Sequence, residues 1–148
     1  MVELAVVLAI SAVVLMVALP DLRPQVAAAD ARSVASGMAD GLQYARQYAL
    51  NTSTLVTFTP SGCGYTVATS AGTQLLSNTV AGGSGVSCQP IGQAVSFLGD
   101  GSVALCTQGV NGLSCSPASA TSTATVSGGG STWTVSLTSG GLISTSLS

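Results

Sequence analysis

The sequence predicts an α+β protein, in which a long, kinked N-terminal helix with an apolar half and an amphipathic half packs on a C-terminal antiparallel β domain. Three observations lead to this prediction. Residues 4–19 are apolar except for Ser11. Apolar positions then recur every three or four residues as far as Ala49, as on one face of a helix. After Asn51 the period becomes two, which is typical of strands.

The first expected segment, residues 1–20, is an apolar helix for a membrane or a filament core. As a helix, residues 4–19 span about 24 Å, so flanking residues would have to complete a crossing of the roughly 30 Å bilayer core. No Lys or Arg precedes this run, which argues against a cleaved signal peptide. A carboxylate in hydrocarbon costs about 3 kcal/mol and usually has a function, so Glu3 is a candidate assembly residue. The alternative is a side chain that reaches out to the membrane surface.

The second expected segment, residues 21–50, is an amphipathic helix. Its predicted apolar stripe consists of Ala31, Val34, Met38, Leu42, Ala45 and Ala49. Proline removes a helical hydrogen bond, so Pro20 and Pro24 are expected to interrupt the helix, with a kink just before Pro20. Asp21 is placed to cap the helix that restarts there.

The third segment, residues 51–148, is expected to be a disulfide-bonded β domain. Its candidate strands are 55–59, 65–69, 94–98, 102–106, 121–126, 132–137 and 142–146, separated by Gly-, Ser- and Asn-rich turns. Gly128 to Gly130 are expected to form a flexible loop. Four cysteines allow three disulfide patterns. We favour Cys63–Cys88 with Cys106–Cys115 because each bond closes a short loop, the alternative being one or two free pairs.

The composition argues against several functions. Only 5% of the residues are charged, and the chain has no Lys and no His. Phosphate neutralisation needs cations, so we expect no nucleic-acid binding by this subunit. General acid–base pairs and metal-ligand clusters are missing, so we expect no enzyme, no metal and no cofactor. We expect Asp100 to be a turn residue rather than a calcium ligand, and Trp133 to pack in the core or on the sheet rather than on a sugar.

The stretch MVELAVVLAISAVVLMVALP, followed by the amphipathic helix, resembles the type IV pilin and type II secretion pseudopilin family. Glu3 matches that family's glutamate, and Pro20 matches its proline. In the family a prepilin peptidase removes a basic leader, and the new N-terminus is methylated. The leader and the two residues before MVEL are absent here, so we expect the mature chain to begin two residues earlier. The segments AVSFLGDGSV and TWTVSLTSGGLIS look like a GspH/FimT-type pilin domain. FimT-like DNA-binding pilins carry arginines around the last Gly turn, and TSGGLISTS has none.

The resemblance implies a structural subunit of a type IV pilus-like fimbrium, a homo-oligomeric helical filament on the cell surface. Such a subunit begins as an inner-membrane precursor with a transmembrane helix, and the pilus assembly machinery extracts it. There the carboxylate of Glu3 pairs with a neighbour's N-terminal amine. The alternative is a minor pilin or pseudopilin that primes or tips a pilus or a secretion pseudopilus. A third hypothesis, from another class, is a membrane-anchored binding module or adhesin.

Overall fold

A computed structural model describes residues 2–18, 22–79, 85–109, 112–118 and 121–148. In these residues two helices, α1 (Val2–Ala18) and α2 (Leu22–Thr52), precede ten strands. The strands are β1 (Val56–Ser61), β2 (Gly64–Thr69), β3 (Gln74–Asn78), β4 (Val86–Gln89), β5 (Ala94–Phe97), β6 (Val103–Gly109), β7 (Gly112–Pro117), β8 (Ser122–Gly128), β9 (Ser131–Leu137) and β10 (Ile143–Leu147). The predicted α+β class is confirmed.

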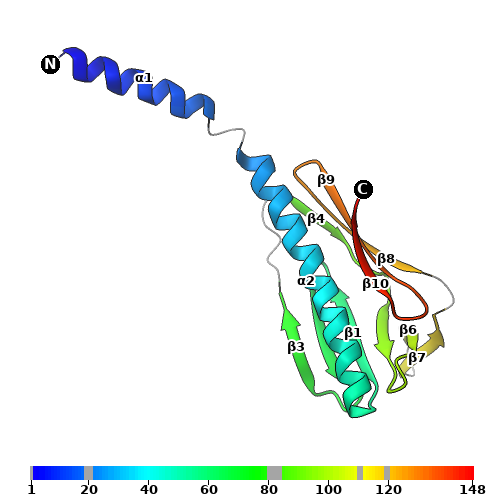
Figure 1. Cartoon of the computed structure of the whole chain (residues 1–148). Coiled ribbons are helices and arrows are strands. Elements are labelled where there is room, and N and C mark those ends of the chain that lie inside the picture. Colours follow the sequence, from blue (N-terminus) through cyan, green and yellow to red (C-terminus); the bar gives the residue numbers. More distant parts are fainter. Residues whose placement is uncertain (1, 19–21, 80–84, 110–111, 119–120) are drawn as a thin grey trace.

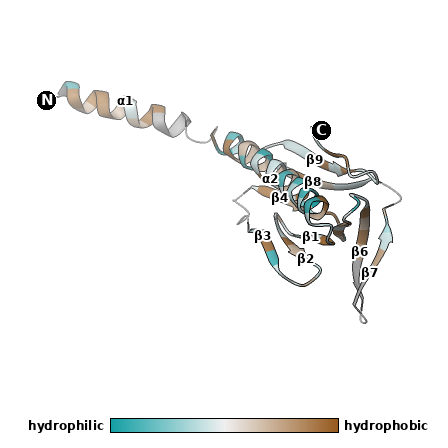
Figure 2. Cartoon of the chain, turned by 60° about the horizontal axis from the view of Figure 1, so that its bottom comes forward, coloured by the Kyte–Doolittle hydropathy of each residue, from teal (hydrophilic) through white to brown (hydrophobic). Residues whose placement is uncertain are grey.

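The first helix, α1, projects away from the sheets (Figure 1). Apolar residues predominate along it, whereas hydrophilic residues recur along α2 (Figure 2). The side chains of residues 3–14 are exposed around the whole helix. Within the described ranges no helix is both long enough and apolar enough to cross a membrane, since α1 has 17 residues.

The second helix, α2, places its small and apolar side chains against the sheets. All six positions of the predicted stripe are buried, together with Ala27, Ala35, Ala39 and Gly41. Alanine is the strongest helix former, so a helix rich in alanine is locally stable even where its buried side chains are short. The helix ends at Thr52, and Ser53 follows with a positive φ of 51°, a left-handed residue of the kind that terminates helices.

The predicted interruption at Pro24 is wrong. Pro24 is the third residue of α2, which continues unbroken to Thr52. The first four N–H groups of a helix have no partner within it, so a proline in the first turn removes no hydrogen bond. Pro20 and Asp21 lie outside the described residues.

Two antiparallel sheets pack with α2, and we call these sheets and α2 together the body of the protein. The larger sheet has the order β3-β2-β1-β5-β6-β7, and the smaller has the order β10-β9-β8-β4. Helix α2 lies along both sheets and contacts strands of each (Figure 1). The core between them includes Phe58, Phe97, Leu42, Val126 and Leu137, each at most 2% exposed. The helix therefore fixes how the two sheets are joined.

All seven predicted strands are present, and three strands were not predicted. The three are β3, β4 and β7, and each lies at an edge of its sheet. Their sequences, QLLSN, VSCQ and GLSCSP, are short and rich in small polar residues. An edge strand has one neighbour and is largely exposed, so it needs no strong alternation of apolar residues. Pairing to the adjacent strand decides its conformation.

The predicted flexible loop at Gly128–Gly130 is instead the tight turn of the β8–β9 hairpin. Gly128 pairs with Ser131, while Gly129 and Gly130 have φ values of 58° and 82°. This turn packs on the first turns of α2. A Cβ atom on Gly129 would overlap the carbonyl oxygen of Pro24, whereas one on Gly130 would meet nothing within 4 Å. Glycine is required here by close approach as well as by backbone conformation.

Alanine substitutions at these two glycines distinguish the cost of a positive φ from the cost of a steric clash with α2. Alanine at Gly130 imposes the positive-φ cost alone, about 1 kcal/mol, whereas alanine at Gly129 adds a clash with the backbone of α2. We expect Gly129→Ala to lower the free energy of unfolding by at least about 1 kcal/mol more than Gly130→Ala does. Urea denaturation of the full chain in detergent measures both. Equal losses in the two variants would mean that the turn does not bear on α2.

Candidate functional site

Of the two residues predicted to matter for assembly, Glu3 lies apart from the body. Glu3 is in the first turn of α1, and its side chain is exposed. Pro20, the other predicted assembly residue, lies outside the described residues. The structure therefore places Glu3 at the far end of an exposed apolar helix (Figure 1).

One disulfide, Cys63–Cys88, joins the two sheets. Cys63 lies in the turn between β1 and β2 of the larger sheet, and Cys88 lies in β4 of the smaller sheet. Cys63 also packs against the hydrophobic core. Strand β4 pairs with β8 and is otherwise an edge. The bond therefore ties an edge strand of one sheet to the other sheet.

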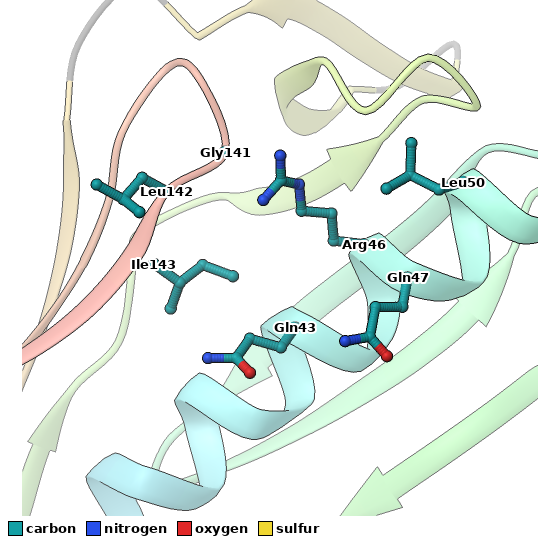
Figure 3. Close-up of a pocket in the computed structure, with 7 residues that line it drawn as sticks. All are labelled: Gln43, Arg46, Gln47, Leu50, Gly141, Leu142 and Ile143. Carbon is teal, nitrogen blue, oxygen red and sulfur yellow. The ribbon is translucent and has the colours of Figure 1, made fainter.

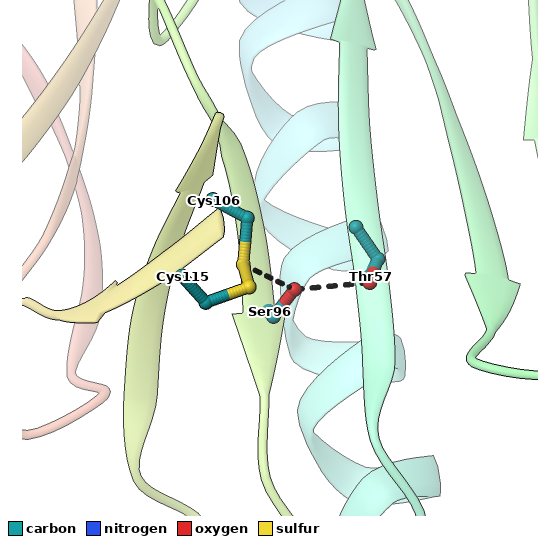
Figure 4. The surroundings of a disulfide bond; sticks show 4 residues. All are labelled: Thr57, Ser96, Cys106 and Cys115. Atoms are coloured by element: carbon teal, nitrogen blue, oxygen red, sulfur yellow. Dashed lines mark hydrogen bonds between the residues drawn. A yellow bond between two sulfur atoms is a disulfide. The ribbon is translucent and has the colours of Figure 1, made fainter. Parts of the chain in front are cut away.

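The second disulfide, Cys106–Cys115, links directly paired residues of β6 and β7. Cys106 is buried and Cys115 is exposed. The Oγ atom of Ser96 lies 3.1 Å from the Sγ atom of Cys106 and 2.9 Å from the Oγ1 atom of Thr57 (Figure 4). A disulfide sulfur carries no proton, so the Ser96 hydroxyl donates to it and accepts from Thr57. These two hydrogen bonds satisfy the donor and an acceptor site of the buried Ser96 hydroxyl.

A pocket of about 270 Å³ lies between the C-terminal half of α2 and the turn that precedes β10 (Figure 3). Its lining consists of Gln43, Arg46, Gln47 and Leu50 from α2 with Gly141, Leu142 and Ile143 from the turn and β10. Arg46 is the one cationic residue in this lining, and the other polar side chains are neutral amides. The pocket therefore combines one positive charge, two amides and exposed aliphatic carbon.

Arg46 was not predicted as a site residue. The last Gly turn carries no arginine of its own, but the fold brings Arg46 of α2 onto that turn. A Cβ atom on Gly141 would lie 3.1 Å from the Nε atom of Arg46 and 3.2 Å from its Cζ atom. The two residues are far apart in the sequence, so no local pattern predicts the contact. Arg46 being the last cation of the chain is the one signal that could have drawn attention to it.

Two other residues have the roles that the sequence favoured. The Oδ1 atom of Asp100 accepts hydrogen bonds from the Ser102 hydroxyl at 2.6 Å and the Ser102 backbone N–H at 2.9 Å. These bonds, the hydroxyl first, hold the pKa of the Asp100 carboxyl below its ordinary value. Trp133 packs against the core, and the guanidinium of Arg32 lies 5.7 Å from the centroid of its ring. Asp100 stabilises a turn, and Trp133 is covered by an arginine.

Each disulfide should protect its own edge strand from opening. In the full chain, we expect the Cys63→Ser/Cys88→Ser variant to raise amide hydrogen exchange in β4 at least tenfold and to leave β7 near its original rate. The Cys106→Ser/Cys115→Ser variant should do the reverse. Each loop closure contributes about 3 kcal/mol in the chain-entropy account, enough for such a change. Equal loss of protection in both strands from either variant would contradict the local role.

Comparisons with known proteins address the body of the chain. A family model described as "Type II transport protein GspH" matches residues 34–141, which is well over half of the chain. No curated protein and no solved structure matches. The matched range begins in the buried stripe of α2 and ends at Gly141, so it includes both disulfides and Arg46. The chain belongs to the GspH family of type II transport proteins, a structural rather than an enzymatic family of pseudopilins.

Proposed function

We propose that this chain is a minor pilin, or pseudopilin, which enters a type II secretion pseudopilus or a related pilus through α1. The observation that carries the proposal is an exposed apolar helix, with one acidic residue in its first turn, attached to a GspH-family body. The apolar surface of α1 is unfavourable in water, so the helix needs either lipid or other helices around it. Bundling with the helices of neighbouring subunits removes that surface from water.

Glu3 is proposed to set the position of the helix within such a bundle. A carboxylate among apolar helices is costly unless a positive group pairs with it. The N-terminal amine of a neighbouring subunit is the partner that the family resemblance implies. A pair of this kind forms at only one axial offset between two helices, so it favours one register over others.

The family assignment supports a minor subunit better than the major subunit of a pilus. A largely uncharged surface suits close packing of many like copies, which by itself would favour a major subunit. The GspH match points instead to a protein of type II transport. We therefore propose an inner-membrane precursor, processed by a prepilin peptidase and assembled by the secretion or pilus machinery into a periplasmic pseudopilus.

The abundance of this chain in purified filaments tests whether it is a minor or the major subunit. Quantitative mass spectrometry of filaments isolated from the periplasm and the surface of the native cells should find far fewer copies of this chain than of the most abundant pilin or pseudopilin. Deletion of its gene should lower the number of filaments, because a priming subunit acts when a filament starts. A copy number equal to that of the most abundant subunit would make this chain the major pilin and would overturn the proposal.

Removal of the Glu3 carboxylate tests the pairing. We expect Glu3→Ala to reduce incorporation into filaments roughly a hundredfold, since loss of one member of a buried ion pair costs about 3 kcal/mol. Asp30→Ala, which removes an exposed carboxylate from α2, is the matched control and should assemble normally. Circular dichroism should show that both variants keep a folded β domain. Normal incorporation of the Glu3→Ala chain would rule out the pairing.

A further inference from the structure

The Nε atom of Arg46 is buried and has no hydrogen-bond partner among the described residues. A buried donor that is left without a partner costs about 1–3 kcal/mol, and such donors are rare in native proteins. The residue that carries this donor, Arg46, lines the pocket between α2 and β10 (Figure 3). The guanidinium group is therefore held at a pocket with hydrogen-bonding capacity unused.

Gly141 holds this guanidinium by its face. A Cβ atom on Gly141 would lie at nearly equal distances from Nε, Cζ and Nη2 of Arg46, 3.1, 3.2 and 3.4 Å. Equal distances to three atoms of a planar group place that position over the plane rather than beside it. The backbone of the turn thus packs on the flat face, and the N–H groups, which lie in the plane, are not used by it. Two parallel N–H groups of arginine match the two oxygens of a carboxylate.

The described residues that line this pocket include no acidic side chain. Asp100 is the one acidic residue after Arg46 in the sequence, and its carboxylate accepts hydrogen bonds from Ser102. The amide side chains of Gln43 and Gln47, in the same lining, are neutral. The pocket therefore has one uncompensated positive charge.

The remaining lining is aliphatic and faces solvent. Leu142 is 65% exposed and Leu50 is 43% exposed, on either side of Arg46. Apolar side chains with a single charged group among them are the usual lining of a ligand pocket. A ligand that fits both parts carries one negative charge next to an aliphatic group.

The geometry points to a peptide-binding site, in which Arg46 takes a carboxylate of a partner protein and Leu50 and Leu142 take the aliphatic side chain beside it. A nucleic acid fits poorly, because a phosphate backbone requires several cations and this lining has one. The inference rests on the proposed function, since a minor subunit at a filament tip is placed to meet other proteins, either subunits or secreted substrates.

The test is made on the full chain in detergent, with N-acetyl-leucine as the probe because it joins a carboxylate to an isobutyl group. Titration is followed through the Arg46 Nε–H signal and the Gly141 and Leu142 amide signals in nitrogen-15 NMR spectra. We expect saturable shifts of all three. The neutral probe N-acetyl-leucinamide should bind at least tenfold more weakly. Equal shifts with the two probes would overturn the role of the carboxylate.

Two variants test whether Arg46 is the residue that binds the carboxylate of N-acetyl-leucine. Arg46→Gln should weaken N-acetyl-leucine binding at least tenfold, while Arg32→Gln, which removes the cation over Trp133, should bind as the original chain does. Undiminished binding by Arg46→Gln would overturn the site. Equal or tighter binding of inorganic phosphate or of a single-stranded oligonucleotide would also overturn it, in favour of a general anion site. The titration needs no filaments, so a chain that fails to enter filaments but binds the probe refutes the proposed function and leaves this site standing.

Discussion

The short side chains on the buried face of α2 let one helix lie against two sheets at once. Ala31, Ala45 and Ala49 are fully buried. At Gly41 the approach is closer still, because a Cβ atom there would overlap the ring of Tyr65. Burying apolar area from both sheets on one helix is the main source of stability available to a domain of this size. The position of the Arg46 pocket and the packing of the β8–β9 turn both follow from this contact.

The four edge strands of the two sheets differ in how they are held in place. Disulfides secure β4 and β7, at one edge of each sheet. The other edges, β3 and β10, carry neither a charged residue nor a proline, the usual devices that discourage strand addition. The body thus has two covalently secured edges and two without a covalent tie, which core packing of Leu75, Leu76 and Ile143 and hydrogen bonds hold.

The sequence predicted those features that depend on local periodicity. The stripe from Ala31 to Ala49 and seven of the ten strands, among them the edge strand β10, each repeat a pattern that one element imposes. The other three edge strands, β3, β4 and β7, were not predicted because pairing with a neighbour, and not composition, determines their conformation. The tight turn at Gly129 was not predicted because it depends on contact with Pro24. The Arg46 pocket was not predicted because two segments far apart in the sequence form it. Features that depend on tertiary contacts have no periodic pattern in the sequence from which they could be predicted.

The seating of α2 on both sheets has a consequence for synthesis. The helix is made first, whereas β8, β9 and β10, which it contacts, are the last strands to be translated. Until then the part of its buried face that packs on these strands has nothing to cover it. Contacts between segments so far apart in sequence form slowly and leave apolar surface open to wrong partners meanwhile. A ribosome stalled before β8 would present a helix with one sheet missing, a species suited to chaperone capture.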